Sequence, residues 1–193
     1  YFYCFFGYAT HGLLDACTSY GTQLFWPFSD ERISWNNISV VDPLLTVPII
    51  IFIIISILKK NKFITFFGVF YIFLYLGIGV VQENRAEKLG KSIAIMRGHE
   101  SKRLTVKPSL GNLFLWKAIY EDNGFYYVDA VRLLSKSEYC QGTKIKKLDA
   151  SINFMELNQN SQQFKDIERF NWFSQGYLGV GTQKNIITDV RYS

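Results

Sequence analysis

One stretch of the sequence, residues 63–81, restricts the fold more than any other. Its nineteen residues include no charged side chain. Because a helix needs about 20 consecutive apolar residues to cross the hydrocarbon core of a bilayer, this stretch predicts a membrane-spanning helix. A shorter apolar run, residues 44–58, precedes it and contains Pro48. Asp42-Pro43 marks its start, since Asp favours the N-cap and Pro the first helical position. The two runs predict a membrane-embedded helical hairpin.

The orientation of this hairpin is left open by the basic residues around it. Lys59, Lys60 and Lys62 lie at its tip and favour a cytoplasmic tip. The basic residues that closely follow the second run favour the opposite side; they are Arg85, Lys88, Lys91 and Arg97. The side on which a soluble domain would lie is therefore undetermined.

Charge divides the chain into two parts. Residues 1–81 hold four basic and four acidic side chains, so the whole net charge of +5 lies in residues 82–193. These basic residues are scattered, and we expect no nucleic-acid partner. A solvated domain that faces anionic lipid is the simpler interpretation, and membrane lipid is the expected partner. We predict a membrane-embedded helical part over 1–81 with a first helix at 3–19, an amphipathic connecting helix over 82–98, and a soluble α+β domain over 99–193.

The soluble part carries strong hairpin signals. Asn123-Gly124 joins two alternating segments, which is the strongest short hairpin signal. In that register Tyr120 faces Tyr127 and Trp116 faces Val131. A helix is expected over 161–174 and a second hairpin over 177–193, with its turn near 183–185. The predicted fold class is a membrane α-helical part followed by a small α+β domain with antiparallel hairpins. The chain begins on helix-like sequence and ends on strand-like sequence, so we expect a fragment of a longer chain.

The first helix carries two groups that do not suit an apolar setting, His11 and Asp15. They are four residues apart and lie on the same helical face. Ionisable residues in a membrane segment are costly and are functional candidates. The pair can share a cation or form a structural hydrogen bond. Imidazole and carboxylate suit zinc or manganese, whereas carboxylate-rich sets favour magnesium. Asp42 is a further candidate, as a third ligand or general base, or simply as a helix cap.

Several motifs together resemble the metal-dependent hydrolases of the bacterial inner membrane. They are Thr10–Asp15, Thr18–Gly21, Leu24–Ser29, Val41–Leu44, Arg97–His99, Lys107–Trp116 and Asp189–Ser193. The resemblance implies a multi-pass inner-membrane protein and a metal-dependent hydrolase of unknown substrate. The family's label also mentions binding of the SOS-response repressor, a candidate protein partner. Upstream Asp and His motifs of the family have no counterpart here. On this basis we predict a divalent metal bound by His11 and Asp15, with Asp42 in a catalytic role.

Other enzyme signatures are missing. The sequence has no Gly-x-Ser-x-Gly and no P-loop lysine, and its two histidines do not assemble a Ser/His/Asp site. His99 is expected to be a surface residue rather than a metal ligand. The alternative function is a non-catalytic membrane protein whose soluble sheet domain binds a protein partner. Its binding face would use aromatic residues of the hairpin, namely Trp116, Tyr120, Tyr126 and Tyr127, although aromatic residues in a hairpin more often form core.

Overall fold

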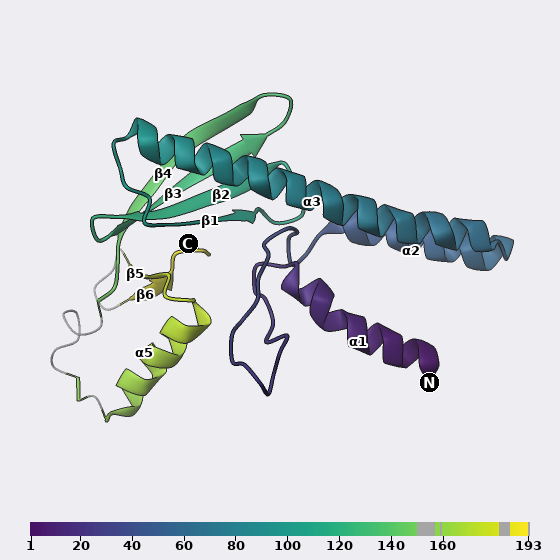
Figure 1. The fold of residues 1–193 in the computed structure, drawn as a ribbon, viewed down its shortest axis with the longest axis horizontal. Coiled ribbons are helices and arrows are strands. Elements are labelled where there is room, and N and C mark those ends of the chain that lie inside the picture. Colours follow the sequence, from purple (N-terminus) through teal and green to yellow (C-terminus); the bar gives the residue numbers. More distant parts are fainter. Residues whose placement is uncertain (150–156, 159, 182–185, 193) are drawn as a thin grey trace.

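A computed structural model describes residues 1–149, 157–158, 160–181 and 186–192. Three helices come first: α1 (Phe2–Ala16), α2 (Pro43–Lys59) and α3 (Lys62–Met96). A four-stranded antiparallel sheet, a helix and a small two-stranded sheet follow. The predicted fold class, helices followed by an α+β part, is confirmed. All of α1, all of α2 and the first half of α3 project from the same side of the sheet (Figure 1).

Helix α1 ends at Ala16, earlier than the predicted residue 19. There, a loop that returns to the helix end donates hydrogen bonds to the terminal carbonyl groups. The amide of Trp35 donates to the carbonyl of Ala16 over 2.7 Å. The amides of Asn37 and Ile38 both donate to the carbonyl of Cys17. The loop thereby holds the end of α1 against the rest of the chain.

The predicted hairpin is formed by α2 and α3. Asp42 caps α2, and Lys60 adopts a left-handed conformation that turns the chain into α3. The two helices are joined by hydrogen bonds between side chains, for example Ser56 to Thr65 at 2.7 Å. Gly68 allows close packing, because a Cβ there would lie 3.1 Å from the Cβ of Phe52.

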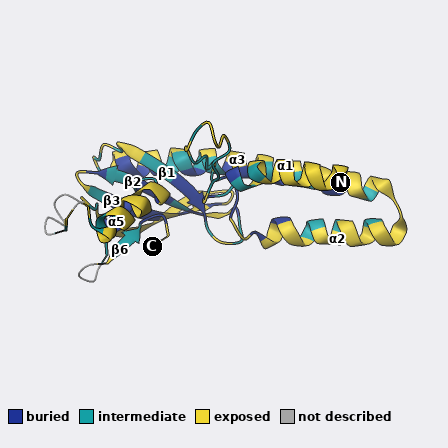
Figure 2. Ribbon diagram, turned by 90° about the horizontal axis from the view of Figure 1, so that it is seen from below, coloured by how far each residue is buried: buried dark blue, intermediate teal, exposed yellow. Residues whose placement is uncertain are grey.

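Only α3, among the helices in the described part of the chain, is long and apolar enough to cross a membrane. With 17 residues, α2 falls short of that length. The expectation of two spanning helices is therefore not supported as it stands. Most side chains of α1, α2 and the first half of α3 are exposed (Figure 2), which suits a lipid environment better than water.

A single helix replaces the predicted pair at 63–81 and 82–98, since α3 has 35 residues and continues to Met96. No residue near position 82 breaks the helical pattern. Instead the burial changes there: Gln82, Ala86, Gly90, Ile93 and Ala94 face the sheet. The side-chain amide of Gln82 donates to the carbonyls of Leu113 and Leu133, over 3.0 and 3.1 Å. These bonds anchor α3 where it meets the sheet.

The four-stranded sheet is a meander of β1 (Arg103–Pro108), β2 (Leu115–Asp122), β3 (Phe125–Leu133) and β4 (Ser137–Lys146). The predicted register of β2 and β3 is confirmed: Tyr120 pairs with Tyr127 and Trp116 with Val131. The turn is of type I′, since Asn123 and Gly124 have φ values of 46° and 76°. Strands β1 and β4 were not predicted, and almost all of β4 is exposed.

The remaining elements are α5 (Gln162–Phe173), β5 (Leu178–Val180) and β6 (Ile187–Asp189). The predicted helix at 161–174 is confirmed, with the Ser161 hydroxyl capping its start. The second hairpin is confirmed by the pairing of β5 with β6. Its expected turn near 183–185 lies outside the described residues. The main core lies between the second half of α3 and one face of the sheet.

Candidate functional site

The predicted metal pair forms one direct contact. His11 Nδ1 lies 3.2 Å from Asp15 Oδ2, on successive turns of α1. Both side chains are accessible, with 70% and 47% of their surfaces exposed. The helical spacing thus brings the two groups together as expected. A hydrogen bond between the two side chains explains this contact. The same imidazole nitrogen and carboxylate oxygen are also metal ligands of the type that divalent transition metals prefer.

The residues of this pair fit a metal in type but not in number. A catalytic zinc site usually has three protein ligands. No group of three His, Cys, Asp or Glu residues suited to a metal occurs in the described residues. His11 and Asp15 therefore supply two donors, and any others would come from solvent, substrate or another segment.

Asp42 acts as a helix cap and lies apart from solvent, with 4% of its surface exposed. Its Oδ1 accepts hydrogen bonds from the amides of Leu44 and Leu45, over 3.1 and 3.3 Å. Its Oδ2 accepts a 2.7 Å hydrogen bond from the hydroxyl of Tyr75 in α3. Both oxygens are thus occupied in joining α2 to α3, and the capping role that the sequence allowed is observed.

A buried ion pair that the sequence did not indicate lies between α3 and the sheet. The guanidinium of Arg97 binds both carboxylate oxygens of Asp129, over 2.7 and 2.9 Å. The hydrogen bond with Asp129 raises the pKa of Arg97 above its ordinary value. The Tyr120 hydroxyl accepts from Arg97 and lies 3.0 Å from His99 Nδ1. His99 is therefore a half-buried neighbour of this network rather than a simple surface residue. Charge complementarity across a long sequence separation produces this site, and the Arg97–His99 motif alone does not identify Asp129 as the partner.

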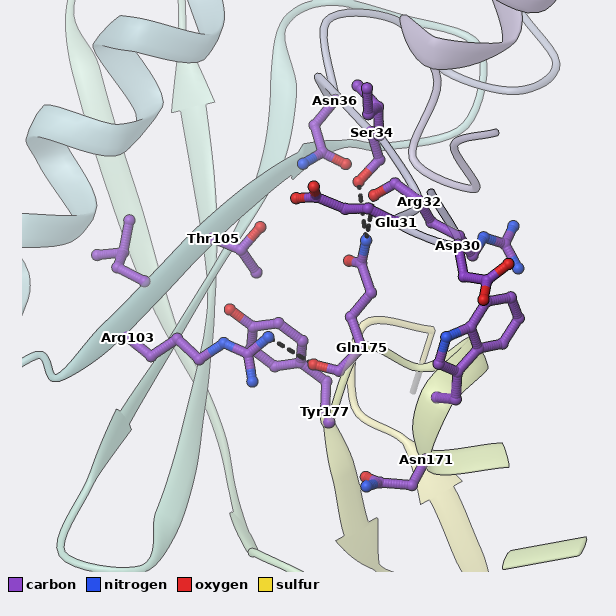
Figure 3. Close-up of a pocket in the computed structure, with 14 residues that line it drawn as sticks. Asp30, Glu31, Arg32, Ser34, Asn36, Arg103, Thr105, Asn171, Gln175 and Tyr177 are labelled. Atoms are coloured by element: carbon purple, nitrogen blue, oxygen red, sulfur yellow. Dashed lines mark hydrogen bonds between the residues drawn. The ribbon is translucent and has the colours of Figure 1, made fainter. Parts of the chain in front are cut away.

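A cleft of about 760 Å³ lies between the loop at 30–36, β1 and the end of α5. Its lining mixes acidic, basic and amide side chains (Figure 3). Gln175 is part of the lining, and its side-chain amide donates a hydrogen bond to the carbonyl of Arg32 over 3.2 Å. The guanidinium carbon of Arg103 lies 4.1 Å from the centre of the Tyr177 ring. Such a lining can hydrogen-bond to a polar ligand or peptide.

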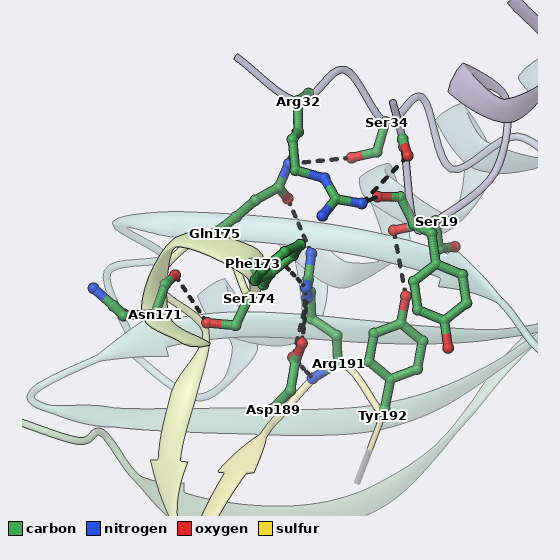
Figure 4. A network of polar contacts seen from close by, with 12 residues as sticks. Ser19, Arg32, Ser34, Asn171, Phe173, Ser174, Gln175, Asp189, Arg191 and Tyr192 are labelled. Carbon is green, nitrogen blue, oxygen red and sulfur yellow. Dashed lines mark hydrogen bonds and ion pairs between the residues drawn. The ribbon is translucent and has the colours of Figure 1, made fainter. Parts of the chain in front are cut away.

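The end of the described chain is held in place by Arg191 (Figure 4). Its Nη2 lies 2.7 Å from Asp189 Oδ2 and donates to the carbonyl of Phe173 over 3.0 Å. Its Nη1 donates to Gln175 Oε1 over 3.0 Å. This network joins β6 to the end of α5 and, through Gln175, to the loop at 30–36.

Three of the four aromatic residues considered for a binding face are core residues. Trp116, Tyr120 and Tyr126 are each 1% exposed or less, because they pack inside the sheet domain. Tyr127 stacks on Tyr120, with ring centres 5.1 Å apart. The three buried rings form core, whereas Tyr127 is half-buried.

Fold and sites together define the class of the protein: an α+β domain carried on a long helix that can cross a membrane. Residues 1–86 match the model of a family described as YdjM inner membrane protein. The match is consistent with a bacterial inner-membrane family and covers α1, α2 and most of α3. No curated protein and no solved structure matches the chain.

Proposed function

We propose that the chain is part of a membrane-bound, metal-dependent hydrolase in which His11 and Asp15 supply two ligands to a divalent metal. The observation that carries the proposal is their 3.2 Å contact on an otherwise uncharged helix. The family match supports the membrane setting, and it includes both residues. The metal would be zinc, manganese or magnesium. When bound, such a metal lowers the pKa of a water and so supplies hydroxide for hydrolysis.

The multi-pass arrangement is part of the same proposal. Most large apolar side chains of α1 and α2 are exposed, and both helices project from the same side of the sheet as the first half of α3 (Figure 1). A bilayer that surrounds α3 would also cover these helices. In that setting the exposed pair on α1 would lie close to the headgroup region or in a polar cavity of the assembled protein.

Metal analysis tests the ligand assignment. Full-length protein should hold a divalent metal, and His11→Ala and Asp15→Asn should each weaken binding at least tenfold, which is about 1.4 kcal/mol. Asp30→Asn, an exposed acid in the loop, is the control and should bind as wild type. Elemental analysis and metal titration provide the measurement. Equal metal content in all four proteins would reduce the pair to a structural hydrogen bond.

The catalytic role proposed for Asp42 can be separated from its capping role. Asn is as good an N-cap as Asp but is not a base, so Asp42→Asn should preserve the start of α2. Asp42→Ala removes both properties and should destabilise the protein by about 1 kcal/mol. If Asp42 is the base, both variants lose hydrolysis of a panel of phosphate and carboxylate esters. Wild-type hydrolysis by Asp42→Asn would leave Asp42 as a cap only.

A second candidate function, binding of a protein partner by the soluble part, is favoured by the mixed-charge cleft beside β1. The family label makes the SOS-response repressor the partner to test. Glu31→Lys reverses an exposed charge in the cleft and should weaken binding of the purified repressor to the full chain. Glu168→Lys on α5, outside the cleft lining, should not. Absence of measurable binding by wild type would eliminate this candidate.

A further inference from the structure

Large apolar side chains gather on two neighbouring connections at one end of the sheet. They form an apolar loop cluster of Leu110, Phe114, Leu115 and Leu134, all of them exposed, Leu110 by 75%. The first three lie at the connection between β1 and β2, and the fourth begins the turn between β3 and β4. The amide of Leu133 donates to the carbonyl of Phe114 over 2.7 Å, so the two connections are adjacent. A gathered apolar group, unlike a single exposed leucine, marks an interaction surface.

Both connections are held by α3 directly after its apolar stretch. The side-chain amide of Gln82 donates to one carbonyl in each connection, those of Leu113 and Leu133. On the next turn of α3, the guanidinium of Arg85 donates to the carbonyl of Leu134 over 2.8 Å. In Figure 1 the connection between β1 and β2 lies at the end of the sheet from which the helices project. The loop cluster therefore lies beside the point where α3 would leave a membrane.

The connection between β1 and β2 also reaches the start of α2. The hydroxyl of Ser39 accepts from the amide of Gly111 over 3.3 Å, and a Cβ at Gly111 would lie 3.3 Å from Pro43 Cδ. The same returning loop packs on the apolar stretch of α3, since a Cβ at Gly79 would lie 2.5 Å from the carbonyl oxygen of Asn37. These contacts place the connection level with the last turn of the apolar stretch.

The polar backbone of this connection is satisfied within the protein. The side-chain oxygen of Asn112 accepts from the amides of Phe114 and Leu115, over 2.9 and 2.7 Å. Its side-chain nitrogen donates to the carbonyl of Leu110 over 3.2 Å. Backbone groups without such partners are costly near hydrocarbon, because no water is there to bind them. The connection therefore meets the main requirement for contact with the edge of a bilayer.

We propose that the loop cluster inserts into the interfacial region of the bilayer that α3 crosses, so that the sheet domain rests on the membrane. The proposal rests on the membrane setting of the proposed function. A bilayer is the occupant because the cluster is continuous with the apolar helices, through the contacts at Pro43 and Gln82. The strength of such a contact scales with the apolar area that enters the interface. Two inserted connections, together with α3, would fix the orientation of the sheet domain on the membrane.

Spin labels on the full chain test the proposal, in vesicles of phosphatidylcholine and phosphatidylglycerol. Each label is attached to one introduced cysteine, in a background with Cys4→Ser, Cys17→Ala and Cys140→Ser. The readout is the ratio of collisions with oxygen, which concentrates in hydrocarbon, to collisions with a water-soluble nickel chelate. Labels at Leu110→Cys and Leu134→Cys should give a ratio several-fold higher than a label in water.

Two further positions calibrate the ratio. Ile95→Cys is the matched control, because Ile95 is also apolar and 74% exposed but lies near the far end of α3. Its label should give the ratio of a label in water. Leu74→Cys, within the apolar stretch, should give the highest ratio and reports whether α3 crosses the membrane.

A charge placed in the cluster provides the second readout. Leu110→Asp should lower the ratio of the label at Leu134→Cys towards the value in water, because a carboxylate is costly in the apolar part of a bilayer. Ile95→Asp is the control and should leave the ratio at Leu134→Cys unchanged.

Several results would overturn the proposal. Water-like ratios at both loop positions, with a high ratio at Leu74→Cys, would reject the insertion while the membrane setting stands. A water-like ratio at Leu74→Cys would reject both. Few collisions with either reagent at the loop positions would assign the cluster to a protein contact. Equal ratios at Leu110→Cys and Ile95→Cys, or no effect of Leu110→Asp, would show that the loops are not the inserted surface.

Discussion

At the scale of single residues, Asp129 is a buried acid whose charge depends on its neighbours. It is 2% exposed, and its charge is balanced by the paired hydrogen bonds from Arg97. Its Oδ1 also accepts from the amide of Gly142 in β4, over 3.0 Å. The sheet register shifts between Val128 and Ala130, which places Asp129 at a bulge. Asp129 therefore links α3, β3 and β4 through one carboxylate.

Replacing Arg97 should show how strongly the stability of the fold depends on its ion pair with Asp129. Arg97→Met leaves a buried carboxylate without its counterion, and we expect the free energy of unfolding to fall by about 3–5 kcal/mol. Urea unfolding of the full chain in detergent, followed by tryptophan fluorescence, provides the measurement. Arg132→Met is the control because the Arg132–Glu138 pair is half exposed, and it should cost about 1 kcal/mol or less. Similar losses in both variants would contradict this account.

Lys107 should make stability depend on pH. Its pKa in the folded protein is about 7, below the ordinary value of 10.5. Between these two values the unfolded chain binds more protons than the folded protein, so stability rises with pH in this window. The charged groups that face Lys107 are Lys117, Arg191 and Asp189. In wild type the unfolding midpoint should rise from pH 7 towards 10.5, and the rise should be smaller in Lys107→Met. Identical pH profiles would show that Lys107 is ionised normally.

At the scale of elements, the hairpin between β2 and β3 depends on its turn. Gly124 has a φ of 76°, which side chains branched at Cβ rarely adopt. Gly124→Val should therefore reduce the free energy of unfolding by more than about 1 kcal/mol, although no atom would meet the new Cβ. Asn123→Gly keeps the turn type available and should cost less. Equal stability of Gly124→Val and wild type would mean that the turn relaxes without strain.

Local signals explain which elements the sequence predicted. Asp42-Pro43 set the start of α2, and Asn123-Gly124 set the β2–β3 register, because each acts within a few residues. By contrast, β4 is a polar edge strand without clear alternation, so its pairing with β3 has no local signal. The continuity of α3 was missed for a related reason. Its composition changes at residue 82 because its surroundings change, while its backbone does not.

The candidate sites also differ in whether a local sequence pattern predicts them. His11 and Asp15 are four residues apart on one helix, so their contact followed from helical geometry. The Arg97–Asp129 pair joins α3 to the sheet. It could not be predicted without the packing of α3 on the sheet. Whether the His11–Asp15 pair binds a metal stays a prediction.

At the scale of the whole molecule, the membrane assignment rests on the first half of α3. Leu74 lies near its middle and is exposed. Leu74→Arg should cost about 2.5–3.5 kcal/mol of insertion free energy on translocon scales. A translocon insertion assay of the full chain provides the measurement. Met96→Arg, at the far end of the same helix, is the control and should insert as wild type. Partitioning of a peptide of residues 40–85 into water would refute the assignment.

Because α3 is continuous, its apolar half and the sheet domain move together as one rigid body. At about 1.5 Å per residue, a helix of this length measures about 52 Å, whereas the hydrocarbon core is about 30 Å thick. The half of α3 that such a core would leave uncovered is the half that packs on the sheet. No flexible joint separates the two, so the sheet cannot tumble independently. A change in bilayer thickness that tilts one end of α3 must swing the sheet, and every site on it, through the same angle.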